Sequence, residues 1–300
     1  MKVGAPARND VHGWVVLDKP AGMTSTQAVT RLKHIFNAKK AGHAGTLDPL
    51  ATGVLPVAFG EATKTVPFVQ DGEKAYRFTV RWGTETDTDD ADGRVAEQSD
   101  ARPAADAILA QLPRFIGTIQ QLPPSYSAIK INGERAYDLA RGGAAPVLVP
   151  RPATIHALEL IDAGRDEAVF EARCGKGTYV RALARDLGRS LGCYGHVSAL
   201  RRTRVGPFFA VDAVLLADLD GEASCVKALR RVEAGLLEVP RVVVDSSIAA
   251  RLRRGQPVLL RGNDVPCDGI AYAAYRGVVI AVGAVEKGEL IPGRVFNLPL

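Results

Sequence analysis

Residues 42–53 of this 300-residue chain have the sequence GHAGTLDPLATG, its most unusual stretch. The glycines permit tight turns and let other backbone segments approach closely. Pro49 restricts Asp48 to an extended conformation, so we expect Asp48 to lie outside any helix. An acidic side chain on a stiff turn between apolar neighbours suits a nucleophile or a base. Asp-Pro is also a common turn dipeptide, and the composition of this segment alone favours a plain turn.

Strands and helices alternate on both sides of this segment. Residues 14–17 form a short apolar run that predicts a buried strand. Residues 76–82 alternate strictly, which predicts a half-buried strand with Tyr76 on its apolar face. Residues 169–174 predict another strand, and residues 178–191 predict a helix. Because short turns join several neighbouring strands, we expect an α/β (α+β) fold with a mixed, largely antiparallel sheet.

The chain is expected to have three regions. Residues 1–10 carry two basic side chains but no apolar core like that of a signal peptide, so they predict a loose tail. Residues 11–239 form the expected catalytic body. The character of the sequence changes near Pro240, and residues 240–300 predict a small β-rich domain. Within this domain we expect a helix at 247–254 and strands at 258–260, 270–275 and 278–285.

Composition excludes several classes of protein. Apolar residues make up 47% and charged residues 24%, which is ordinary for a globular chain. The longest apolar runs are too short to cross a bilayer, so we expect a cytoplasmic protein without membrane contact. Four cysteines occur without a C-x-x-C pair, which argues against a zinc site or a redox motif.

Basic side chains gather in three clusters. The net charge is +5, from 38 basic and 33 acidic residues, which is compatible with a polyanionic partner. Each cluster has two interpretations, contact with nucleic-acid phosphates or an ordinary solvated surface, and the second is the plainer one. The clusters are Lys33, Lys39 and Lys40; Arg201, Arg202 and Arg204; and Arg251, Arg253 and Arg254.

Two ligand motifs are incomplete. Residues 87–93 (DTDDADG) begin like a calcium loop, but Ala91 takes the fifth position and Gln98 the twelfth, so we expect a solvated loop. Asp90 is the member of this loop in which a supporting role is most readily tested. Residues 175–178 (GKGT) lack the earlier glycine of a phosphate loop, which leaves ATP binding unsupported.

Four motifs occur in a fixed order: Lys19-Pro20 after a strand, residues 45–53 (GTLDPLATG), Tyr76 opening a strand, and residues 176–181 (KGTYVR). Together they resemble the TruB family of tRNA pseudouridine synthases, which isomerise uridine-55 in the T loop. The resemblance covers about residues 13–204. The last sixty residues match least, and by position they would be the small PUA-like RNA-binding domain of that family.

This resemblance implies a role for individual residues. Asp48 matches the catalytic aspartate, Tyr76 the tyrosine that stacks on the extruded base, and Arg181 would pair with Asp48. No cofactor and no metal are implied, and the expected partner of this monomer is the T arm of tRNA. The residues that match substrate-binding positions are His43, Tyr179, Leu200 and Lys19, the last of which would touch phosphate or support the catalytic loop.

Other interpretations remain open for the residues taken singly and for the whole chain. Tyr76, Tyr179 and Leu200 would look the same as plain core residues, and most arginines make surface or structural ion pairs. A non-catalytic RNA-binding or tRNA-folding protein would also use basic clusters and a β-rich domain. A glycoside or nucleoside hydrolase would break a similar bond, but such enzymes usually need two carboxylates and residues 42–53 supply one.

Overall fold

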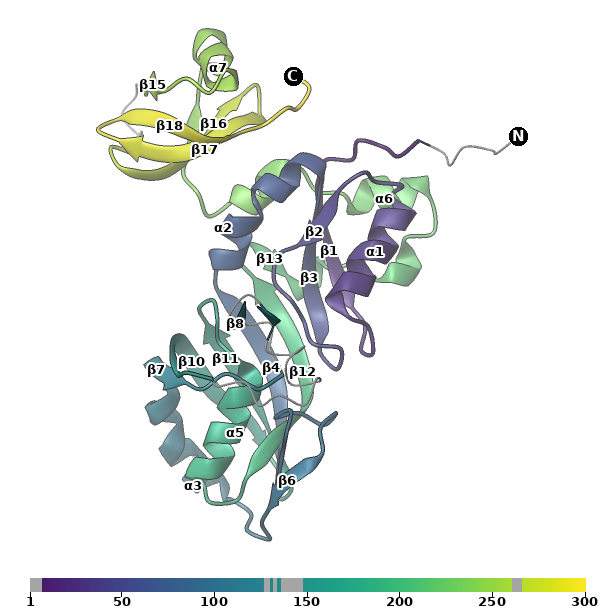
Figure 1. Ribbon diagram of the computed structural model, residues 1–300, viewed down its shortest axis with the longest axis vertical. Helices are drawn as coiled ribbons and strands as arrows, with labels where there is room; N and C mark the ends of the chain where they lie inside the picture. The colour runs from purple at the N-terminus through teal and green to yellow at the C-terminus, as the bar shows by residue number, and fades with distance from the viewer. Residues whose placement is uncertain (1–6, 127–129, 132–133, 136–147, 261–265) are drawn as a thin grey trace.

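The computed structural model describes residues 7–126, 130–131, 134–135, 148–260 and 266–300 (Figure 1). Within these residues the strands form one nine-stranded sheet, one five-stranded sheet and two small hairpins. The hairpins pair β5 (Thr84–Thr86) with β6 (Val95–Gln98), and β8 (Lys130–Ile131) with β9 (Glu134–Arg135). The α-helices are α1 (Ser25–Ile35), α2 (Val66–Asp71), α3 (Ala105–Gln111), α5 (Val180–Ser190), α6 (Glu222–Ala228) and α7 (Ser246–Arg253).

The nine-stranded sheet runs through the body in the order β1-β3-β12-β4-β11-β10-β7, with β2 on β3 and β13 on β12. Its pairs are antiparallel except for the parallel pair of β12 and β3, so the predicted mixed, largely antiparallel sheet is confirmed. Its strands are β1 (Gly13–Lys19), β2 (Ala41–His43), β3 (Thr52–Phe59), β4 (Lys74–Trp82), β7 (Gly117–Gln121), β10 (Arg151–Ala163), β11 (Glu167–Cys174), β12 (Gly195–Val205) and β13 (Phe208–Phe209).

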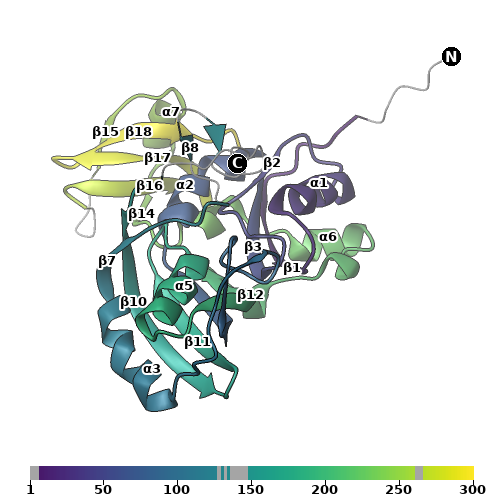
Figure 2. The ribbon, with the colours of Figure 1, turned by 60° about the horizontal axis from the view of Figure 1, so that its bottom comes forward.

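Strand β4 lies at the centre of this sheet, between β12 and β11. Phe78, Val80 and Trp82 are buried, while Arg77 and Arg81 are exposed, as the alternation in the sequence predicts. Helix α5 covers the same region and packs against β12 and β4 (Figure 2), and its Leu183 and Leu187 are buried. The first turn of α5 therefore lies beside the strand that carries Tyr76.

The carboxy-terminal sheet has the order β14-β16-β17-β18-β15, and α7 packs on it. Apolar side chains of this sheet form their own core with α7, and others join a core that includes Trp14 and Val16 of β1. The sequence predicted α7 and three of these strands but missed β14 and β18. The strands are β14 (Arg241–Val243), β15 (Val258–Leu259), β16 (Gly269–Tyr275), β17 (Val278–Glu286) and β18 (Glu289–Val295).

Polar contacts also join this sheet to the body. Lys64, in the 3-10 helix η1 (Gly60–Lys64), donates to the carbonyl of Val295 at 2.8 Å, and Glu61 accepts from the backbone N–H of Asn297 at 2.7 Å. Glu233, in the 3-10 helix η5 (Val232–Leu236), accepts from the backbone N–H of Val279. Across the described residues, no helix combines the length and the apolar character that a bilayer span requires.

Candidate active site

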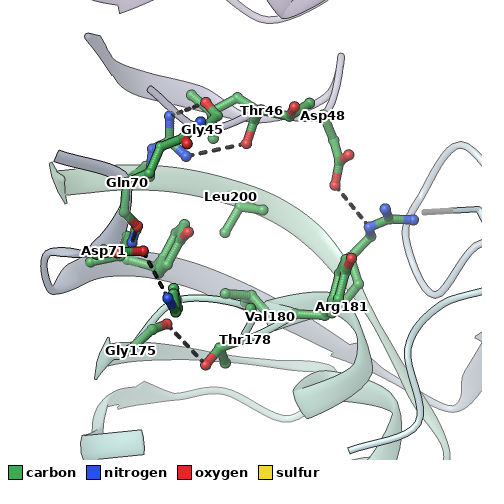
Figure 3. Close-up of a pocket in the computed structure, with 17 residues that line it drawn as sticks. Gly45, Thr46, Asp48, Gln70, Asp71, Gly175, Thr178, Val180, Arg181 and Leu200 are labelled. Carbon is green, nitrogen blue, oxygen red and sulfur yellow. Dashed lines mark hydrogen bonds and ion pairs between the residues drawn. The ribbon is translucent and has the colours of Figure 1, made fainter. Parts of the chain in front are cut away.

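A pocket of about 390 Å³ opens between the segment 45–48, the end of α2 and the turn that leads into α5 (Figure 3). In Figure 3 Leu200 of β12 lies between the Gly45–Thr46 side and the Thr178–Val180 side. Tyr76 and Lys74 of β4 also line it. The pocket-lining residues are Gly45, Thr46, Leu47, Asp48, Gln70, Asp71, Lys74, Tyr76, Gly175, Lys176, Gly177, Thr178, Tyr179, Val180, Arg181, Leu200 and Arg202.

Asp48 faces Arg181 across one side of this pocket, with 2.9 Å between the aspartate Oδ2 and the arginine Nε. The Asp48 side chain is 35% exposed, whereas Arg181 is 5% exposed. The two remaining nitrogens of Arg181 donate to the carbonyls of Thr88 and Tyr126, at 2.8 and 2.9 Å. These two carbonyls therefore hold the guanidinium in place. The predicted pair of Arg181 with Asp48 is confirmed.

The segment 84–90 contacts one face of α5 through its acidic side chains. Arg181 also lies 3.4 Å from Asp90, Arg185 pairs with Asp89 at 2.8 Å, and Arg189 pairs with Glu85. The expectation of a solvated loop over residues 87–93 is wrong for Asp89 and Asp90, which are 5% exposed and face arginines one helical turn apart, whereas Asp87, Ala91 and Asp92 are exposed. Burial raises the pKa of Asp89 to about 6, although the charge of Arg185 opposes the shift.

The turn that carries Asp48 is anchored to the end of β1. Lys19 is 0% exposed, and its ammonium donates to the carbonyls of Pro20, Met23 and Pro49 at 2.8, 2.7 and 3.3 Å. This geometry corresponds to the loop-supporting role, the second of the two expected for Lys19. Burial lowers the pKa of Lys19 to about 8, and the charge of Asp48 opposes the shift.

A second anchor lies on the other side of Asp48. The Ser25 hydroxyl donates to the carbonyl of Leu47 at 3.0 Å and accepts from its backbone N–H at 2.8 Å. Ser25 is buried in the first turn of α1, whose capping box is formed by Thr24 and Gln27. The backbone on both sides of the aspartate is therefore held by side chains from β1 and α1.

Arg202 lies under the same loop. It is 2% exposed, and it donates to the carbonyls of Val54, Thr46 and Gly45 at 2.9, 3.2 and 3.0 Å. Both interpretations of this basic residue, a phosphate contact and a solvated surface, are wrong, because the side chain points into the body. Its neighbours are also paired internally: Arg201 with Asp18, and Arg204 with Glu73 and Glu238.

The expected base-binding residues come together at the pocket. Tyr76 and Leu200 line it from adjacent strands, and Leu200 is buried. Burial raises the pKa of the Tyr76 hydroxyl, and the charge of Arg202 opposes the shift. Tyr179 also lines the pocket, and its backbone N–H and carbonyl both bond to the side chain of Gln121. No local pattern pointed to Gln121, because its partner lies 58 residues away.

His43 is not among the residues that line this pocket. It ends the short strand β2, where it pairs with Val57 of β3, at the start of the loop that leads to Asp48. Burial, and then the charge of Arg202, lower the pKa of His43. The described residues hold no group of three or more His, Cys, Asp or Glu side chains arranged to bind a metal ion.

Family models match most of the body. Residues 33–180 match the amino-terminal domain of the TruB family pseudouridylate synthases, and residues 181–232 match the carboxy-terminal domain of tRNA pseudouridylate synthase B. The sheet and the pocket therefore lie in a chain that belongs to the TruB family of pseudouridylate synthases. This places it among the isomerases, as the motifs around Asp48 indicated.

Relatives and solved structures agree with this assignment. The tRNA pseudouridine synthase B of Rhodopseudomonas palustris is 61% identical over 98% of this chain and 84% of that protein. The protein of the same name from Chelativorans sp. is 52% identical over 96% of each chain. A chain from the crystal structure of a Cbf5-Nop10-Gar1 complex is 26% identical, with a TM-score of 0.74 over 95% of this chain and 84% of that one.

Proposed function

We propose that this chain converts uridine to pseudouridine at position 55 in the T loop of tRNA, with Asp48 as the catalytic group and without a cofactor. The single observation that carries the proposal is the partly exposed Asp48 carboxylate, held by the buried Arg181 at the rim of the pocket that Tyr76 and Leu200 line. The names of the relatives, tRNA pseudouridine synthase B, support tRNA as the substrate.

The reaction neither adds nor removes atoms overall. The bond between N1 of uracil and C1′ of ribose breaks, the base turns, and a new bond joins C5 to C1′ while the C5 proton is lost and N1 gains one. A carboxylate assists such a reaction by transient covalent attachment. Arg181 keeps Asp48 aimed, because three of its nitrogens are fixed by Asp48 and by two backbone carbonyls.

The target base must leave its stack to reach Asp48. Enzymes that act on a base in folded nucleic acid extrude it into a closely fitting pocket and stack it against aromatic or apolar groups. Tyr76 and Leu200 provide such a surface beside Asp48, and Tyr179 borders it at the start of α5. Binding through the T arm is part of this proposal, as is the contact of His43 with the T loop.

The test is incubation of the purified chain with unmodified tRNA, followed by chemical mapping of pseudouridine at single-nucleotide resolution. We expect modification at uridine-55 by the wild type and none by Asp48→Asn. Asp166→Asn is a matched control, because Asp166 is an exposed carboxylate that also pairs with an arginine, Arg102, away from the pocket. Conversion by Asp48→Asn at the wild-type rate would remove Asp48 from the mechanism.

Other products would identify the alternatives. A chain that binds tRNA and yields no pseudouridine under any condition would be an RNA-binding or tRNA-folding protein. Release of free uracil would instead indicate a hydrolase, since water would then have taken the place of C5 at the ribose carbon.

A further inference from the structure

Arg202 is buried, and no carboxylate of the described residues lies within ion-pairing distance of its guanidinium. Its neighbours in sequence, Arg201 and Arg204, both form ion pairs, whereas Arg202 forms none within the part of the chain that the structure describes. Removing a charge from water is costly unless a counter-ion or several hydrogen bonds compensate it. A side chain kept in this state at the floor of a pocket is a candidate for a functional role.

The hydrogen bonds of Arg202 reach both sides of the Asp48 loop. Gly45 and Thr46 precede Asp48, and Val54 follows it on β3. The backbone of Arg202 also pairs with that of Gly53. A Cβ atom on Gly53 would lie 2.2 Å from the Arg202 carbonyl, so the backbones of β12 and β3 are in direct contact. One residue thus joins the two ends of the segment from which Asp48 projects.

Arg202 also lies beside Tyr76 at the pocket. The two residues are register partners on the adjacent strands β12 and β4, and both line the pocket. The charge of Arg202 lowers the pKa of the Tyr76 hydroxyl against the effect of burial. Arg202 therefore contacts the loop of one catalytic candidate and lies next to another.

We infer that Arg202 is a positioning residue, which fixes the loop of Asp48 relative to Tyr76 for the chemical step. This inference rests on the proposed function. The three carbonyls each accept from a different nitrogen of Arg202, an arrangement that the planar fork of a guanidinium provides and the one nitrogen of an ammonium does not. Arg202 acts through these groups, and loss of its positioning lowers kcat rather than weakening the binding of tRNA.

The test compares Arg202→Lys and Arg202→Ala with the wild type. The substrate is tRNA labelled with tritium at uridine C5, and this tritium is released when the new bond forms at C5. We expect kcat to fall by about 100-fold in Arg202→Ala and by about tenfold or more in Arg202→Lys, with KM unchanged. Methylguanidinium should restore part of the kcat of Arg202→Ala, whereas its neutral analogue methylurea should not, because the missing group is a planar, charged guanidinium.

Arg102 provides the matched control. It also donates to two loop carbonyls, Ser99 and Ala101, and it lies away from the pocket. Arg102→Lys and Arg102→Ala should lose stability without a comparable loss of kcat. If Arg202→Ala fails to fold, Arg202→Lys decides the question, since it retains the charge and most of the volume.

Three results would overturn the inference. They are a wild-type kcat in Arg202→Lys, a raised KM with unchanged kcat, and equal rescue by methylurea. Absence of pseudouridine from the wild type would instead refute the proposed function itself, so the two failures are distinguishable.

Discussion

Replacing Lys19 with methionine should destabilise the chain and slow the reaction without changing the salt dependence of tRNA binding. The ammonium donates three hydrogen bonds, to Pro20, Met23 and Pro49, and each bond from a charged donor contributes about 2 kcal/mol. Burial disfavours the charged form and lowers its pKa from 10.5 to about 8, so the three bonds together contribute less than their sum. The free energy of unfolding should therefore fall by roughly 3 kcal/mol in Lys19→Met.

Two measurements check this estimate. Urea unfolding gives the free energy change, with Lys227→Met as the control, because Lys227 is an exposed lysine of α6. Titration of tRNA binding against salt separates the two roles that the sequence left open for Lys19. If Lys19 supports the loop, the log–log slope is unchanged. A slope smaller by about 1 in Lys19→Met would show a lost phosphate contact and refute the reasoning.

Three further predictions concern stability, each read by urea unfolding. The pKa of Asp89 is raised from 3.8 to about 6 in the folded state, so folding favours the protonated carboxyl. Its contribution to the free energy of unfolding is therefore present below pH 3.8 and is lost as the pH rises through about 6. Asp89→Asn should remove this component, which is at most about 3 kcal/mol; an unchanged pH profile would contradict the assignment. Gly53→Ala should cost roughly 3 kcal/mol or more, because Gly53 has φ +100° and faces a backbone carbonyl, whereas Gly22→Ala, at φ +77° in open space, should cost about 1 kcal/mol. Equal losses for the two would argue against the close contact. Phe170→Ala should cost about 4 kcal/mol, because Phe170 is fully buried and stacks on Phe78, and a loss below about 1 kcal/mol would contradict its place in the core.

The sequence predicted those features whose causes lie close together along the chain. The alternation of β4 and the helix over residues 178–191 are local patterns, and both are present. The pair of Asp48 and Arg181 was anticipated from the resemblance of two motifs, although 133 positions separate them, and the contact is present.

The features that were missed depend on partners distant in sequence. The acidic segment 84–90 has the composition of a solvated loop, and only the arginines of α5 explain its burial. Arg202 belongs to a basic cluster that favours a surface interpretation, yet its partners are backbone carbonyls, which composition does not reveal. Gln121 likewise can be recognised as a residue of the site only from the fold, which places it beside Tyr179.

The core that joins the two sheets has a consequence for substrate selection. Trp14 of the body and Phe296 of the carboxy-terminal sheet belong to one apolar cluster, and Lys64 links the same two parts through Val295. A hinge between the parts would expose this cluster to water, at a cost of about 25 cal/mol for each Å² uncovered. An RNA that contacted both parts would therefore have to place its target base at one fixed distance from the second contact.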